Sequence, residues 1–162
     1  MITFSKITDI KATLRSELDT GKTIGFVPTM GALHEGHLEL MRRAKKENDI
    51  LVVSIFVNPI QFNNPEDLRK YPRNNDEDSK LIDSVECDFL FLPDVEEMYP
   101  EKVTKKYDFG DLETVMEGAS RPGHFNGVGV VVSKLFDICM PTKSYFGEKD
   151  FQQLAIIKKL VS

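Results

Sequence analysis

The sequence has few cysteines, no excess of positive charge and no long hydrophobic run. Cys87 and Cys139 lack the spacing of a metal or redox site, so a reduced, cytoplasmic setting is the simplest interpretation. A net charge of −5 argues against a nucleic-acid partner, which usually requires a basic face. The longest apolar run, residues 50–57, is too short to span a bilayer, and residues 1–6 lack the apolar core of an export signal. We therefore expect neither a nucleic-acid nor a membrane partner.

The bulk composition is that of an ordinary globular protein. The chain has 162 residues, of which 41% are hydrophobic and 29% charged. This length suits one domain with its own core, so we expect residues 1–162 to form a single domain.

Apolar runs alternate with stretches of helical periodicity, which predicts an α/β fold. A first helix is expected at residues 7–20 with Thr8 as its cap, and Pro28 should end the first strand because it has no N–H for a neighbouring strand. Strands are predicted at residues 23–27, 50–57, 88–92 and 143–146, and further helices from about 34–37 onward and at 65–70, 76–85, 111–116, 128–136 and 151–161.

The chain is organised around residues 23–47, which read as strand, turn and helix. Leu38, Met41 and Ala44 recur with helical spacing between charged residues, and Gly31 and Gly36 bracket the turn before them. The start of a helix presents uncovered N–H groups and a positive dipole end. We therefore expect this turn to suit an anion such as phosphate.

The turn contains the motif His34-Glu35-Gly36-His37, for which three interpretations compete. The first is two solvated or hydrogen-bonded histidines at a helix start. The second is a zinc site, but the zinc-protease pattern places its two histidines four residues apart, whereas here they are three apart. The third is a nucleotidyl-transfer site in which both imidazoles face phosphates. The strand–turn–helix context favours the third.

Residues 28–37, Pro-Thr-Met-Gly-Ala-Leu-His-Glu-Gly-His, resemble the signature of the pantoate–β-alanine ligases, or pantothenate synthetases. Three later segments, residues 56–62, 121–128 and 146–154, resemble the same family in the same order. The resemblance implies a Rossmann-like, doubly wound parallel sheet of the H-x-G-H nucleotidyltransferase type. It also implies ATP-dependent ligation of pantoate and β-alanine to pantothenate through a pantoyl-adenylate, with Mg²⁺ and a homodimer.

The resemblance also implies roles for individual residues. Glu77 and Asp78 match acidic positions that the family associates with magnesium, but acids at a helix start more often only compensate the helix dipole, so the metal ligands stay undecided. The expected catalytic residues are His34, His37 and Lys149; the ATP-binding residues Met30, Gly31, Ala32, Leu33, His34, Glu35, Gly36, His37, Gly147, Glu148, Lys149 and Asp150; and the substrate-binding residues Gln61, Gln153 and Asn58.

Two other functions stay open at this point. One is another nucleotidyltransferase of the H-x-G-H superfamily, and the other is a domain that binds nucleotide without catalysis. The family also has a Ser-Ser-Arg loop and a smaller C-terminal domain, neither of which this sequence contains. We therefore expect the isolated chain to fold but to make little or no pantothenate.

Overall fold

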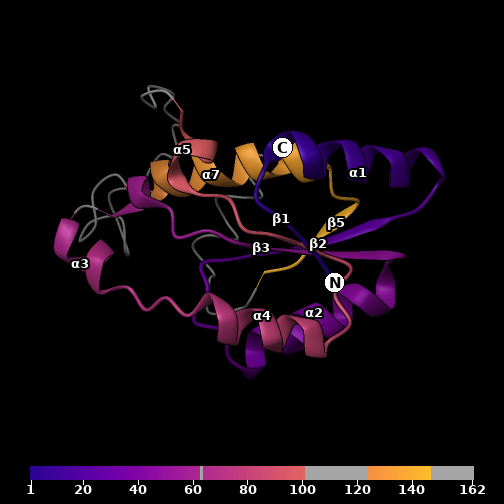
Figure 1. Cartoon of the computed structure of the whole chain (residues 1–162), viewed down its shortest axis with the longest axis horizontal. Coiled ribbons are helices and arrows are strands. Elements are labelled where there is room, and N and C mark those ends of the chain that lie inside the picture. Colours follow the sequence, from indigo (N-terminus) through magenta and orange to yellow (C-terminus); the bar gives the residue numbers. More distant parts are fainter. Residues whose placement is uncertain (63, 101–123, 147–162) are drawn as a thin grey trace.

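The structure, a computed structural model, describes residues 1–62, 64–100 and 124–146 (Figure 1). Within these ranges a parallel sheet is covered by helices on both faces, so the predicted α/β class is confirmed. The helices predicted at residues 111–116 and 151–161 lie outside the described residues. The strands are β1 (Ile2–Phe4), β2 (Ile24–Thr29), β3 (Ile50–Ile55), β4 (Phe89–Phe91) and β5 (Lys143–Ser144). The helices are α1 (Ile7–Asp19), α2 (Glu35–Glu47), the 3₁₀ turn η1 (Pro59–Gln61), α3 (Pro65–Lys70), α4 (Asn75–Ser84), α5 (Val95–Met98) and α7 (His124–Cys139).

The order of the strands places a crevice beside β2. The sheet runs β1-β4-β3-β2-β5. Apart from the edge strand β1, the chain moves from β2 through β3 to β4 and then returns to place β5 on the other side of β2. This reversal is the switch point of a Rossmann-like sheet, where ligands bind beyond the carboxyl ends of the strands. The predicted Rossmann-like fold is therefore confirmed.

Two hydrophobic cores fill the space between the sheet and its helices. Helices α1 and α7 pack on one face, and α2 and α4 cover the other (Figure 1). Strand β3, buried at every residue, contributes to both cores, as its continuous apolar sequence predicts. The predicted apolar stripe of α2, residues Leu38, Met41 and Ala44, is buried. No helix in the described ranges is long and apolar enough to cross a membrane.

Pro28 does not end β2, contrary to the sequence-based prediction, because β2 continues to Thr29. Successive residues of a strand turn their backbone N–H and C=O groups toward opposite neighbouring strands. The Thr29 carbonyl accepts from the β3 side, from Phe56 N–H, whereas the Phe26 carbonyl accepts from Tyr145 N–H on the β5 side. Pro28 therefore turns its nitrogen toward the β5 side, beyond the last paired residue of β5. No strand hydrogen bond is lost there, so the proline fits within the strand.

The N-terminal region differs from its prediction at the start of α1. The helix begins at Ile7, so Thr8 is not its cap, and the preceding Lys6 makes no capping bond with its side chain. Instead the Ile7 N–H donates to Glu97 Oε2 at 2.6 Å. Glu97 lies in α5, which was not predicted because it has only four residues. Strand β1 was also missed, since three residues are too few to show an alternating pattern.

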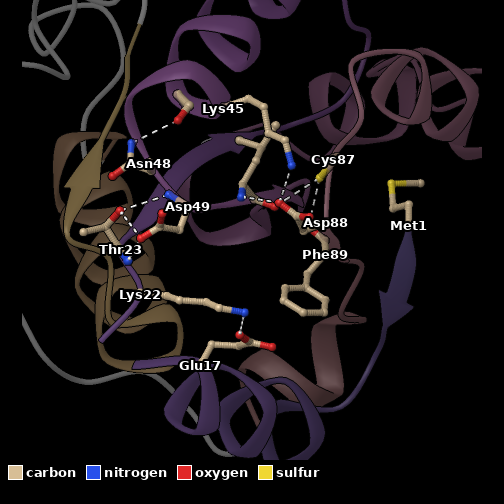
Figure 2. Close-up of polar contacts among 12 residues, drawn as sticks. Met1, Glu17, Lys22, Thr23, Lys45, Asn48, Asp49, Cys87, Asp88 and Phe89 are labelled. Carbon is tan, nitrogen blue, oxygen red and sulfur yellow. Dashed lines mark hydrogen bonds and ion pairs between the residues drawn. The ribbon is translucent and has the colours of Figure 1, made fainter. Parts of the chain in front are cut away.

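Aspartates hold the amino ends of the central strands together (Figure 2). Asp49 accepts from the Thr23 N–H at 2.8 Å, next to the start of β2. Asp88 Oδ2 accepts from Lys45 Nζ at 2.9 Å and from the Leu51 N–H at 2.8 Å, which links α2, β3 and β4. These contacts lie at the edge of the sheet opposite the carboxyl ends of the strands. They stabilise the fold and leave the carboxyl edge available for ligands.

Both cysteines are buried, single thiols in the described part of the chain. Burial raises the pKa of Cys87 to about 12 and that of Cys139 to about 12. Thiolate, the reactive form, is therefore scarce at neutral pH in the folded chain.

Gly25 lets α2 approach β2 closely, and we expect Gly25→Ala to lower the free energy of unfolding by about 1–3 kcal/mol. An added Cβ would lie 2.6 Å from Asn48 Nδ2 and 3.1 Å from the Ala44 carbonyl oxygen, and the latter is backbone that cannot rotate away. Urea denaturation measures the change. The exposed Ser16→Ala in α1 is a control expected within about 0.5 kcal/mol of the parent chain. Equal stability of the two variants would contradict the close-approach argument.

Candidate functional site

A cavity of about 350 Å³ lies at the carboxyl edge of the sheet. This volume falls within the range of small-molecule sites. The ends of β2, β3 and β5 and one face of α7 form its wall, so it occupies the switch point described above. The lining residues are Val27, Pro28, Thr29, Met30, Gly31, Ala32, His34, His37, Leu40, Phe56, Asn58, Tyr71, Val128, Val131, Val132, Leu135, Tyr145 and Phe146.

The loop from β2 to α2 is fixed by a buried carboxylate. Gly31 and Ala32 have positive φ angles of 82° and 51°. This conformation costs a non-glycine residue such as Ala32 about 1 kcal/mol or more, so its surroundings must hold it. Asp78, only 4% exposed, does so from the first turns of α4. Its Oδ2 accepts from the Ala32 N–H at 3.0 Å and its Oδ1 from the Leu33 N–H at 3.1 Å.

The two histidines of the motif cap α2. His34 is the N-cap residue, and its Nδ1 accepts from the Gly36 N–H at 3.0 Å. The Nδ1 of His37 accepts in turn from the His34 N–H at 3.2 Å. The rings lie 4.1 Å apart between centroids and are tilted by 45°. Since a ring nitrogen that accepts carries no hydrogen, these contacts assign the hydrogen of each neutral ring to Nε2. In this arrangement Nε2 is the donor of each imidazole.

Most backbone N–H groups of the turn are already bonded within the protein. That of Gly31 donates to the Thr29 hydroxyl at 3.2 Å. The next two donate to Asp78, and those of His34 and Gly36 to the imidazoles. The prediction that this helix start presents uncovered N–H groups to an anion is therefore wrong for these amides. Among the side chains of residues 30–37, only the two imidazoles carry N–H donors.

The predicted ATP-binding residues of the turn divide into two groups. Met30, Gly31, Ala32, His34 and His37 line the cavity, whereas Leu33, Glu35 and Gly36 lie outside its lining. Glu35 instead pairs with Arg42 at 2.6 Å, a contact that lowers the pKa of the glutamate. Leu33 packs against the hydrophobic core between the sheet and helices α2 and α4, whereas Glu35 and Gly36 are exposed to solvent.

Asn58 follows β3 and is held by a residue far away in the sequence. It lines the cavity and is 1% exposed. The hydroxyl of Tyr99, next to α5, donates to Asn58 Oδ1 at 2.7 Å. Gln61 ends η1, and its side chain lies outside the described part of the structure. Gly147, Glu148, Lys149, Asp150 and Gln153 also lie outside the described residues.

The described residues contain no cluster of three or more His, Cys, Asp or Glu side chains able to hold a metal ion. Glu77 and Asp78, which the resemblance associates with magnesium, have other partners. Both oxygens of Asp78 bind loop amides, and Glu77 Oε2 accepts from Asn74 Nδ2 at 3.1 Å. These two carboxylates therefore do not form a ready cation site in this conformation.

Sequence reasoning missed the roles of Asp78 and Tyr99. Asp78 stood out only as one of several acids at a helix start, and no local pattern shows that it reaches a loop 45 residues away. Tyr99 lies in a stretch with weak periodicity, and its partner is 41 residues distant. Both contacts depend on the packing of separate elements. The structure supplies the signal that the sequence lacks, because it shows that this acid in the first turn of a helix is buried.

Comparison with known proteins gives a consistent result. A family model described as pantoate-beta-alanine ligase matches residues 2–162. The pantothenate synthetase of Cytophaga hutchinsonii is 54% identical over 100% of this chain and 57% of its own length. That of Phocaeicola vulgatus is 60% identical over 91% of this chain and 54% of its own length. The chain thus spans little more than half the length of these relatives.

Comparison with solved structures points to the same family. The pantoate-beta-alanine ligase of Francisella tularensis, in complex with β-γ ATP and β-alanine, superposes with a TM-score of 0.94 and 45% identity, over 99% of this chain and 62% of that one. The pantothenate synthetase of Thermus thermophilus gives a TM-score of 0.91 and 47% identity, over 99% of this chain and 57% of that one. The resemblance inferred from four segments is confirmed, and the chain belongs to the pantoate–β-alanine ligase family.

Proposed function

We propose that this chain forms the site for ATP and pantoate in an enzyme that condenses pantoate with β-alanine. The observation that carries the proposal is the cavity at the switch point, which is lined by both imidazoles of the family signature and by Asn58. The relative from Francisella tularensis supports the choice of ATP and β-alanine as ligands. The products would be pantothenate, AMP and pyrophosphate.

The first step needs little proton chemistry. A pantoate carboxylate oxygen attacks the α-phosphorus of ATP, the bond to the bridging oxygen breaks, and pyrophosphate leaves. Because the carboxylate is already ionised, the site has to align the reactants and offset negative charge. The Nε2–H groups of His34 and His37 would donate to phosphate oxygens as charge shifts toward pyrophosphate. Lys149 is proposed to add a positive charge on the basis of the resemblance.

The second step uses the same cavity. The amine of β-alanine attacks the carbonyl carbon of pantoyl-adenylate, the C–O bond to AMP breaks, and the amine loses a proton. Asn58, Gln61 and Gln153 are proposed to hold pantoate through uncharged amides. Mg²⁺ would enter as part of the MgATP substrate, since the carboxylates associated with it here are already bonded. The mainly apolar wall contributed by α7 would limit access of water to the adenylate.

Two half-reactions test this function. Exchange of labelled pyrophosphate into ATP that requires pantoate reports adenylate formation, and AMP release that requires β-alanine reports the second step. We expect both in the chain extended by the C-terminal part of the Cytophaga hutchinsonii relative, and weak or no turnover in the 162-residue chain. ATP binding without pantoate-dependent exchange in the extended chain would overturn the proposal in favour of a nucleotide-binding domain. Exchange supported by other acids but not by pantoate would indicate another nucleotidyltransferase.

The resemblance also leads us to propose a homodimer that works in the cytoplasm. Light scattering of the extended chain at tens of micromolar checks the dimer, and a monomer mass would contradict it.

A further inference from the structure

One wall of the cavity follows the shortest strand of the described sheet. Strand β5 has two residues and pairs with β2 alone in that sheet. The two residues after it, Tyr145 and Phe146, line the cavity. The Tyr145 N–H still donates to the Phe26 carbonyl at 2.9 Å. So short a pairing holds the following residues only loosely, and the position of this wall depends on side-chain contacts.

The Tyr145 hydroxyl ties this wall to the end of α2. It donates to Glu47 Oε1 at 2.6 Å and accepts from Asn48 Nδ2 at 2.9 Å. Asn48 is the C-cap residue of α2 and is 8% exposed, and its Nδ2 also donates to the Ala44 carbonyl at 3.0 Å. The hydroxyl is therefore bonded both as a donor and as an acceptor, and both partners lie at the end of one helix.

The same helix carries an imidazole of the candidate site. His37 and Leu40 line the cavity and lie on one side of α2, because residues three or four apart are neighbours on a helix surface. This side continues through Ala44 to Glu47 and Asn48. Helix α2 thus connects the imidazole at its start with the partners of the Tyr145 hydroxyl at its end. The hydroxyl fixes the wall after β5 relative to this helix.

The charge of Glu47 strengthens the contact. A carboxylate in the last turn of a helix is disfavoured by the helix dipole, and Glu47 is the last residue of α2. The bond from Tyr145, and then that from Arg43, lowers the pKa of Glu47, while burial and the bond to Glu47 raise the pKa of Tyr145. At neutral pH the phenol therefore donates to a carboxylate, which is the stronger kind of hydrogen bond.

The strand order places this wall away from the proposed pantoate site. Asn58 follows β3, the imidazoles follow β2, and Tyr145 follows β5, in the spatial order β3-β2-β5. With pantoate at Asn58 and the phosphates of ATP at the imidazoles, the β5 side of the cavity is left for the rest of the nucleotide.

We propose that Tyr145 is a positioning residue for ATP: its hydroxyl, held by Glu47 and Asn48, fixes the wall after β5 against α2, so that the cavity keeps the width that the nucleotide needs. This inference rests on the proposed function, because it takes ATP as the ligand beside the imidazoles. It assigns the role to the hydroxyl and its two partners, and the packing of the tyrosine ring is separate from it.

Tyr145→Phe tests the proposal, because it removes the hydroxyl and keeps the ring. In the extended chain described above, we expect the Kd for ATP to rise about fivefold, the effect of losing one well-placed hydrogen bond. The KM for pantoate should stay within about twofold, since Asn58 lies across β2 from this wall. Calorimetric titration with ATP and steady-state kinetics measure the two constants. A general loss of structure would instead change both of them.

Variants of Glu47 separate the tether from other effects of the tyrosine. Glu47→Ala removes the acceptor and should raise the Kd for ATP as Tyr145→Phe does, whereas Glu47→Gln keeps an accepting oxygen and should stay within about twofold of the parent. Adding Glu47→Ala to Tyr145→Phe should raise the Kd no further, while independent effects would multiply. Glu39→Ala, which removes an exposed carboxylate of the same helix outside the cavity lining, is the matched control.

Three results would overturn the inference while the proposed function stands. They are an unchanged Kd for ATP in Tyr145→Phe, an equal rise of the KM for pantoate, and multiplying effects in the double variant. Absence of pantoate-dependent exchange in the parent enzyme would overturn the proposed function instead. The titrations with ATP alone would still decide the role of Tyr145 in that case, because they need no acid substrate.

Discussion

Replacing His37 with glutamine should lower kcat by about 10²–10³ while leaving the chain as stable as the parent, because removing one preorganised donor from a developing negative charge has an effect of this size. His37 holds the third helical position of α2, where its Nδ1 caps the His34 N–H. Glutamine is a common residue at this position of a capping box and can replace the capping bond. It lacks the imidazole, whose Nε2–H is the group proposed to meet the phosphates.

His37→Ala provides the matched comparison. It removes both the cap and the Nε2 donor, so kcat should fall as far as in the glutamine variant, and the free energy of unfolding should fall by about 1 kcal/mol as well. Steady-state kinetics of the extended chain and urea denaturation of the 162-residue chain measure the two effects separately. Near-parental turnover in the glutamine variant would show that the cap, rather than the imidazole, is what catalysis needs.

Asp78→Ala should be the most destabilising single change at the site, at about 3–5 kcal/mol. It removes both acceptors from the amides of Ala32 and Leu33, and hydrogen bonds to a charged group contribute about 1.5–3 kcal/mol each. The left-handed conformation of Ala32 would lose its support at the same time. Because this loop belongs to the ten-residue signature, residues 28–37, we also expect the affinity for ATP to fall by at least about tenfold.

Asp76→Asn is the control for this prediction, and Asp78→Asn is the milder test. Asp76 lies in the same first turn of α4 but is exposed, so its loss removes only a favourable helix-dipole contact of about 0.3–1 kcal/mol. Asp78→Asn keeps one acceptor and sets an NH₂ group against the second amide, so its effect should lie between those of Asp76→Asn and Asp78→Ala. Urea denaturation and calorimetric titration with ATP measure both quantities. The positioning role would be refuted if Asp78→Asn and Asp76→Asn behaved alike.

The parts of the fold that the sequence predicts are those with a strong local pattern. Strand β3 is buried on both faces and therefore has a continuous apolar sequence, which identified it as a strand. Helix α2 is buried on one face only and therefore has apolar residues at helical spacing, which identified it as a helix. Elements of three or four residues, β1 and α5, are too short to show a period. The position of Pro28 within β2 depends on where β5 stops pairing, a tertiary fact.

The candidate site divides in the same way. The motif located His34 and His37 and their place at a helix start, since that information lies within ten residues of sequence. It did not show that the amides of the turn are already bonded, because Asp78 comes from another helix. A pattern of residue types thus identifies which groups are present, whereas packing decides which of them remain to meet a ligand.

The bonded amides of the β2–α2 turn have a consequence for the thermodynamics of binding. A glycine-containing loop that adopts many conformations without its ligand loses conformational entropy when the ligand orders it, and that loss weakens the affinity. Here Asp78 and the two capping imidazoles hold the backbone in one arrangement before any nucleotide arrives. Nucleotide binding should therefore cost little conformational entropy in this turn. The two imidazoles should already hold fixed positions when the phosphates bind.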